Sequence, residues 1–153
     1  MAGVSNYEPY SSNAESFTQV LIDLKDTMAG KTVYAVAGFG ALAFENVTQG
    51  AALYSRSSDG KVGLARAAGT LDEATVVGFA QTAKNIGEEV RVLTIGVLAT
   101  SGLDAGDPFY LATGYGGITA TPPSTAGQYL VRVGEASTTA NLTIQLEPPI
   151  LLS

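Results

Sequence analysis

The sequence predicts a mainly β protein: a small β-sandwich or barrel-like domain of two similar β modules, preceded by an N-terminal extended arm and one amphipathic helix. Short apolar runs alternate with turns rich in glycine and proline, which is typical of antiparallel strands. The chain also resembles itself, because the stretch that begins at Gly50 has the same plan as the stretch that begins at Gly106. One segment, residues 14–28, has a helical period instead, so the helix is expected before the β region.

The strands are clearest between Gly106 and Ala136. An apolar run through Tyr110 and Leu111 ends at the glycines of residues 114–117, and a second run follows, as in a β-hairpin. Pro122 and Pro123 lack backbone donors and end the second strand. Residues 129–133 then alternate apolar and polar positions and are expected to form a third strand.

The same plan occurs upstream, and the two stretches align without a gap when Gly50 is placed on Gly106. Leu53 and Val62 then correspond to Phe109 and Ile118, and the identical pairs are Gly50 and Gly106, Tyr54 and Tyr110, Gly60 and Gly116, Val77 and Val133, Gly78 and Gly134, and Ala80 and Ala136. Glycine and alanine are common in this chain, so a chance alignment of two hairpin-rich stretches is the alternative. A true repeat predicts two similar modules around one core.

The remaining strands of the first module are expected at residues 62–65, 75–80 and 90–97, with a loop around residues 69–73. A last strand is expected where Leu142, Ile144 and Leu146 alternate. Glu147-Pro148-Pro149 then ends the pairing and leaves an apolar tail, Ile150-Leu151-Leu152. Because three exposed aliphatic side chains are unfavourable, the tail is expected to be buried against the body or a neighbouring subunit.

The region before the β domain divides into three parts, and we place the boundary between residues 1–45 and 46–153. Residues 1–13 are predicted to form an extended arm, with a disordered terminus as the alternative. The helix of residues 14–28 has an apolar stripe, which packs on the β body or on another subunit. The small residues of 33–44 are expected inside the protein or at an interface; their GFGALA matches a dinucleotide-binding fingerprint only superficially, because no βαβ unit surrounds it.

Composition argues against most kinds of chemistry. The chain has no histidine and no cysteine, which removes Ser-His-Asp and Cys-His catalysis and the usual zinc, haem and iron-sulfur ligands. Its net charge is −6 and only 14% of its residues are charged, so no nucleic-acid partner is expected, and no apolar run is long enough to span a membrane. We expect no enzyme, no cofactor and no metal. The carboxylate pairs are interpreted as solvated turn residues: Asp72 with Glu73, Glu88 with Glu89, and Asp104 with Asp107.

Four segments together carry a resemblance to a known family: GDPFYL, GGITATPP, AGQYLVRVGEA and LTIQLEPPILL. This series resembles the C-terminal part of the capsid decoration, or cement, proteins of tailed bacteriophages. Upstream, VTQGAALY, GKVGLARA and VVGFA resemble the first half of the same β domain, so the resemblance covers about residues 46–152.

The resemblance implies a viral structural protein on the outer capsid surface of the virion, where a homotrimer clamps neighbouring major capsid subunits. Similar β domains occur in phage tail, fibre and baseplate components, so a structural role in the tail is the alternative function. A second alternative is a carbohydrate-binding surface module that uses exposed tyrosines such as Tyr115. As a hypothesis, the inter-subunit contacts come from the arm, the helix stripe and the tail: Tyr7, Tyr10, Phe17, Val20, Leu21, Leu24, Ile150, Leu151 and Leu152.

Overall fold

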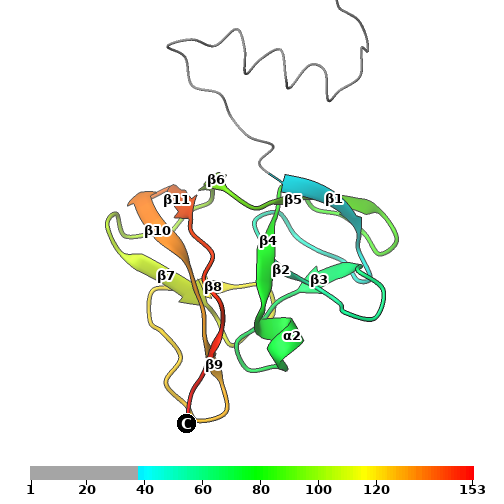
Figure 1. The fold of residues 1–153 in the computed structure, drawn as a ribbon. Helices are drawn as coiled ribbons and strands as arrows, with labels where there is room; N and C mark the ends of the chain where they lie inside the picture. Colours follow the sequence, from blue (N-terminus) through cyan, green and yellow to red (C-terminus); the bar gives the residue numbers. More distant parts are fainter. Residues whose placement is uncertain (1–37) are drawn as a thin grey trace, which may run out of the picture. The chain divides into compact units, whose positions relative to one another are not determined.

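A computed structural model describes residues 38–153, which form a β body with one short helix (Figure 1). Sheet 1 is antiparallel, with neighbouring strands in the order β1 (Gly38–Leu42), β5 (Glu89–Leu93), β4 (Val76–Ala80), β2 (Ala52–Ser55) and β3 (Val62–Leu64). Sheet 2 has the order β6 (Gly96–Ala99), β11 (Asn141–Ile144), β10 (Arg132–Thr138), β7 (Pro108–Leu111) and β8 (Ile118–Thr119). A two-stranded C-terminal ribbon pairs β9 (Tyr129–Leu130) with β12 (Ile150–Leu151), and helix α2 spans Leu71–Ala74.

The predicted mainly β fold of two similar modules is confirmed. Strands β2, β3 and β4 of module 1 begin at the positions that align with the first residues of β7, β8 and β10 of module 2, and the two sheets have the same order of corresponding strands. Even the hydrogen bonds repeat: the Gly50 amide donates to the Ala80 carbonyl at 2.8 Å, and the Gly106 amide donates to that of Ala136 at 2.7 Å. The sequence repeat is therefore a structural repeat and not a chance alignment.

A β-bulge at the same place in both modules explains two of the repeated glycines. The register of β2 against β4 shifts after Leu53, and that of β7 against β10 shifts at the corresponding position, beside Gly78 and Gly134. A Cβ atom at either glycine would overlap a carbonyl oxygen of the neighbouring strand, that of Leu93 or of Thr143. The close approach of two strands thus requires glycine at both positions.

Neither sheet closes into a barrel, so the barrel-like form of the prediction does not apply. In sheet 1 a single bridge between Ala43 and Val62 links the ends of the two edge strands and encloses a small core. That core contains Leu53, Val90 and Val92, among others. The main core is shared by both modules, and its members include Phe79 from module 1 and Phe109, Leu111 and Leu142 from module 2.

Three local predictions are corrected. The strand expected at residues 90–97 is two strands, because the chain leaves sheet 1 after β5 and enters sheet 2 at Gly96, whose φ of +104 begins β6. The loop expected at residues 69–73 contains α2, whose N-terminus has a capping box between Thr70 and Glu73. The strand pairing expected to end at Glu147-Pro148-Pro149 resumes after the prolines, because the apolar tail forms β12.

The N-terminal predictions are only partly covered by the structure. The predicted arm and the predicted helix of residues 14–28 lie outside the described residues. Within the small-residue segment, β1 forms an edge strand of sheet 1 and leaves Phe39 and Leu42 exposed in the part of the chain that the structure describes. The boundary at residue 46 stays a prediction, although β1 precedes it and pairs with β5.

Candidate interaction surfaces

The C-terminal ribbon contains the predicted contact residues that the structure describes, Ile150, Leu151 and Leu152. In β12, Ile150 pairs with Leu130 and Leu151 pairs with Tyr129. Two further bonds extend the ribbon, since the Gly127 amide donates to the Leu152 carbonyl and the Leu152 amide donates to that of Gln128, both at 2.8 Å. Successive side chains of a strand point to opposite faces, so Ile150 and Leu151, each 59% exposed, give an aliphatic group to each face.

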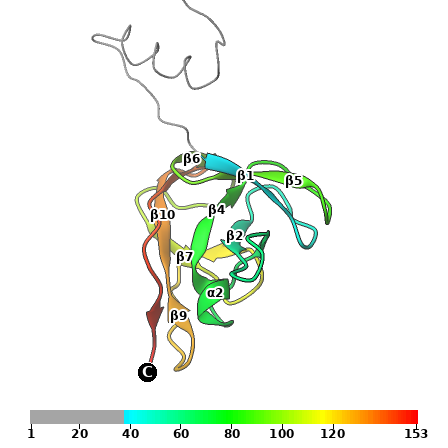
Figure 2. The ribbon, with the colours of Figure 1, turned by 45° about the vertical axis from the view of Figure 1, so that its right-hand side comes forward.

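The ribbon is attached firmly at one end and free at the other. Val131 lies between β9 and β10 and is fully buried in the shared core, which fixes the base of the ribbon. Figures 1 and 2 show the ribbon extending beyond the two sheets, with the C-terminus at its end. Residues 118–131 and 148–153 contain no charged side chain. A partner would therefore meet a surface without charged side chains, and its binding should depend little on salt.

The other predicted contact residues cannot be placed. Tyr7, Tyr10, Phe17, Val20, Leu21 and Leu24 lie outside the described residues, and their contacts stay a prediction. Leu152 is half-buried within the ribbon, so it contributes less exposed surface than its two neighbours.

Sequence reasoning missed exposed apolar residues at an edge strand of each sheet. Phe39 and Leu42 are exposed on β1, and Ile95, just before β6, and Val97, within it, are also exposed. A hollow of about 380 Å³ lies between the sheets beside β6 and is lined by Leu93, Val97 and Leu98 among others. The sequence predicts one strand over residues 90–97, which would place Ile95 and Val97 within a single sheet. That pattern therefore did not indicate that they are exposed at an edge strand of sheet 2.

Three of the six paired carboxylates have structural partners. Asp72 accepts a hydrogen bond from the Ser57 amide at 3.2 Å, and Glu73 caps α2 and pairs with Arg66 at 2.9 Å. Glu88 accepts a hydrogen bond from the Asn85 amide at 2.8 Å and closes a turn. Within residues 38–153, no group of three or more His, Cys, Asp or Glu side chains is arranged to hold a metal ion.

Tyr115 is exposed in the hairpin turn between β7 and β8, as a sugar-stacking residue would need to be. The guanidinium of Arg66, however, lies over its ring, 4.5 Å from the centroid. This cation–π contact covers one face of the ring and joins the two modules. A sugar could stack only on the opposite face of Tyr115.

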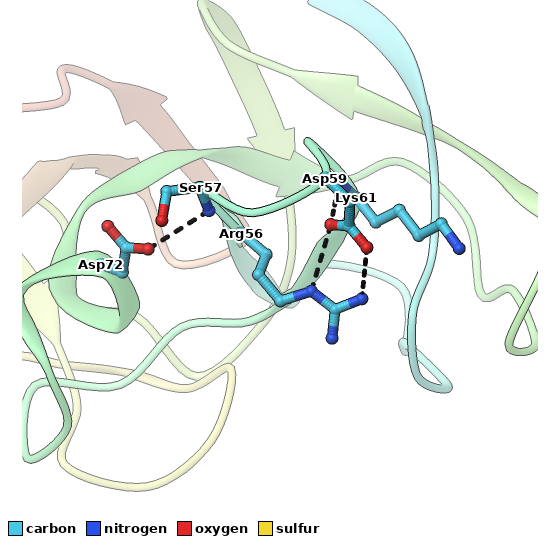
Figure 3. Close-up of polar contacts among 5 residues, drawn as sticks. All are labelled: Arg56, Ser57, Asp59, Lys61 and Asp72. Atoms are coloured by element: carbon cyan, nitrogen blue, oxygen red, sulfur yellow. Dashed lines mark hydrogen bonds and ion pairs between the residues drawn. The ribbon is translucent and has the colours of Figure 1, made fainter.

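The turn of the first hairpin is closed by an ion pair (Figure 3). The Arg56 guanidinium donates two hydrogen bonds to Asp59, from Nε at 3.1 Å and from a terminal nitrogen at 2.6 Å. These bonds, together with one from the Lys61 amide, lower the pKa of Asp59 to about 2. Arg56 also lies over the ring of Phe44, 4.1 Å from its centroid. The turn is therefore a fixed, charged structure.

Asp59→Asn is expected to lower the melting temperature at pH 7 and to have little effect near pH 2. Because the pKa of Asp59 is lower in the folded than in the unfolded chain, its stabilisation is present above about pH 4 and is lost as the pH falls towards 2. Thermal melts of both proteins between pH 7 and pH 2 measure this. In an Arg56→Gln background the substitution should make no difference; an equal effect there would contradict the assignment to this ion pair.

No protein-family model matches the chain, and no curated protein matches it. Among the described residues, no helix has the length and apolar character that crossing a membrane requires.

Proposed function

We propose that this chain is a capsid decoration, or cement, protein of a tailed bacteriophage, which binds the outer surface of the head as a homotrimer and stabilises contacts between major capsid subunits. The C-terminal ribbon is the observation that carries the proposal. It presents Ile150 and Leu151 on a support that has no charged side chain, so a partner that covers the ribbon would bury aliphatic surface on both of its faces. The resemblance of residues 46–152 to decoration proteins supplies the kind of partner.

The rest of the body suits a clamp. Its two modules share one core, so force applied at one sheet is transmitted to the other through packed side chains. The carboxylates Asp72, Glu73 and Glu88 stabilise turns and the helix. A clamp acts through many weak contacts, and their sum across a shell is large because each copy binds at several points.

The test is attachment to heads that lack this chain. The purified protein should bind them at saturating occupancy, and a variant without residues 1–28 should bind at least about tenfold more weakly while keeping a folded body, because it lacks the predicted arm and helix stripe. Occupancy is measured by quantitative gel analysis of repurified particles, and folding by circular dichroism. Binding to isolated tails instead of heads would favour a tail, fibre or baseplate component, and unchanged occupancy of the shortened variant would refute the role of residues 1–28.

A further inference from the structure

The two modules are joined by backbone hydrogen bonds as well as by their core. The Ala52 amide of module 1 donates to the Gly116 carbonyl at 2.9 Å, and the Ala67 amide donates to the Ala112 carbonyl at 2.8 Å. In return, the Gly116 amide donates to the Ala65 carbonyl at 2.7 Å. We call Ala52, Ala65 and Ala67, which supply two amide donors and one carbonyl acceptor, the donor face of module 1, and residues 112–117, which supply two carbonyl acceptors and one amide donor, the acceptor turn of module 2.

This joint is closely packed. At Gly116, whose φ is +72, an added Cβ would lie 3.0 Å from Leu64 Cδ2 and 3.2 Å from Ala51 Cβ. Arg66 reaches across the joint to the ring of Tyr115. At the corresponding glycine of module 1, Gly60, the backbone has the same conformation, but an added Cβ would meet nothing within 4 Å. The turn thus packs against the other module at Gly116, whereas the corresponding turn of module 1 is open at Gly60.

Each module has a counterpart of both sides of the joint. Two of these surfaces take no part in the joint: the module 2 counterpart of the donor face and the module 1 counterpart of the acceptor turn. In module 2, the residues that align with the donor face are Pro108, Thr121 and Pro123. The counterpart of the acceptor turn in module 1 is the turn of residues 56–61. If these surfaces kept the chemistry of the joint, the turn of one molecule would fit the free face of the next. Repeat arrays avoid such growth by changing their terminal surfaces.

The free donor face is changed at both amides that the joint uses. The two donating amides, of Ala52 and Ala67, are replaced by Pro108 and Pro123, which have no amide hydrogen. The buried side chains beside them change as well: Val76 and Phe79 of module 1 correspond to Arg132 and Glu135. Arg132 is held by Gln145 at 3.1 Å and by Glu147 at 3.5 Å. This face therefore lacks the two amide donors. Covering it would also remove water from the charged groups of Arg132 and Glu135, which opposes docking.

The free turn is changed in a complementary way (Figure 3). Ala112, Tyr115 and Gly117 of the acceptor turn correspond to Arg56, Asp59 and Lys61. The amide of Gly60 already donates to the Arg56 carbonyl at 2.7 Å, whereas the equivalent Gly116 amide donates across the joint. Docking this turn would bury the Arg56–Asp59 ion pair, and the loss of hydration would oppose binding.

We infer that these two surfaces are the blocked ends of a two-module array. They correspond to the two sides of one joint, their natural occupant would be a second copy of this chain, and the prolines and charges keep copies from joining head to tail. Any self-association of the natural protein must then use a different surface, such as the C-terminal ribbon or the edge strands β1 and β6.

Two full-length variants test this. The open-face variant restores the module 1 residues at four positions: Pro108→Ala, Pro123→Ala, Arg132→Val and Glu135→Phe. The open-turn variant restores the module 2 residues at three: Arg56→Ala, Asp59→Tyr and Lys61→Gly. Each variant alone has only one unblocked surface, so each should keep the mass of the natural protein. An equimolar mixture, followed by sedimentation velocity with one variant labelled, should form mixed complexes with an affinity at least about tenfold higher than either self-association.

The mixture separates a specific joint from general stickiness. If the open-face variant binds itself as strongly as it binds the open-turn variant, exposed apolar surface alone explains the association, and the inference is wrong. Two folded variants that do not bind each other would overturn it as well. Should the fourfold variant fail to fold, Pro108→Ala with Pro123→Ala restores the two donors alone, and it should bind the open-turn variant more tightly than the natural protein does.

Discussion

Replacing Ile150 and Leu151 together with aspartate should weaken attachment to heads, and assembly of the free protein, by at least about 100-fold. Each side chain is 59% exposed and is proposed to become buried in a contact. Losing that burial and placing two carboxylates in an apolar contact costs about 3 kcal/mol or more, which corresponds to this factor. Sedimentation velocity measures the assembly, and occupancy of repurified heads measures the attachment.

The control is Ile86→Asp, which changes an aliphatic residue of comparable exposure in a turn of module 1. It should leave both readouts unchanged. The melting temperature of the double variant should also stay close to that of the natural protein, because neither aliphatic belongs to the core. Equal losses in the Ile86 variant, or normal attachment of the double variant, would contradict the role of the ribbon.

Phe79→Ala should reduce the free energy of unfolding by about 3–5 kcal/mol and destabilise both modules together. Phe79 is fully buried and belongs to the core that includes Phe109, Leu111 and Leu142 of module 2. The cavity would therefore open inside a shared core rather than within one module. Chemical denaturation measures the loss, and hydrogen exchange shows whether the amides of β4 and β11 lose protection in the same transition.

The repeat supplies a matched control at the equivalent place. Glu135 occupies the position of Phe79 in module 2 and is exposed there. Glu135→Ala is expected to change the free energy of unfolding by less than about 0.5 kcal/mol. Loss of protection in module 1 alone after Phe79→Ala would mean that the modules unfold separately, against the shared core.

The repeat could be predicted from the sequence because glycines recur at equivalent positions of the two modules, where a positive φ or a close contact excludes a side chain. Gly78 and Gly134 lie at a bulge where a neighbouring carbonyl excludes a Cβ, and Gly60 and Gly116 have positive φ in a hairpin turn. Such positions tolerate few residues other than glycine, so they stay recognisable when the core residues differ. Leu53 and Phe109 show the contrast, since they occupy equivalent places with different side chains.

Features that depend on contacts between distant residues could not be predicted in this way. The ribbon needs Ile150 to meet Leu130, and nothing in the local pattern around Pro148 and Pro149 indicates that partner. The change of sheet at Gly96 is invisible because apolar residues alternate on both sides of it. Helix α2 did leave a signal, the Thr70-x-x-Glu73 capping box, but one turn is too short to show a helical period.

The most direct test of the proposed function is a cryo-EM map of the intact virion that contains this chain. We expect threefold density for the β body on the outer surface of the head, with the C-terminal ribbon of each copy in contact with a neighbouring copy or with a major capsid subunit. Density for the β body on the tail alone, or a head surface without it, would contradict the account.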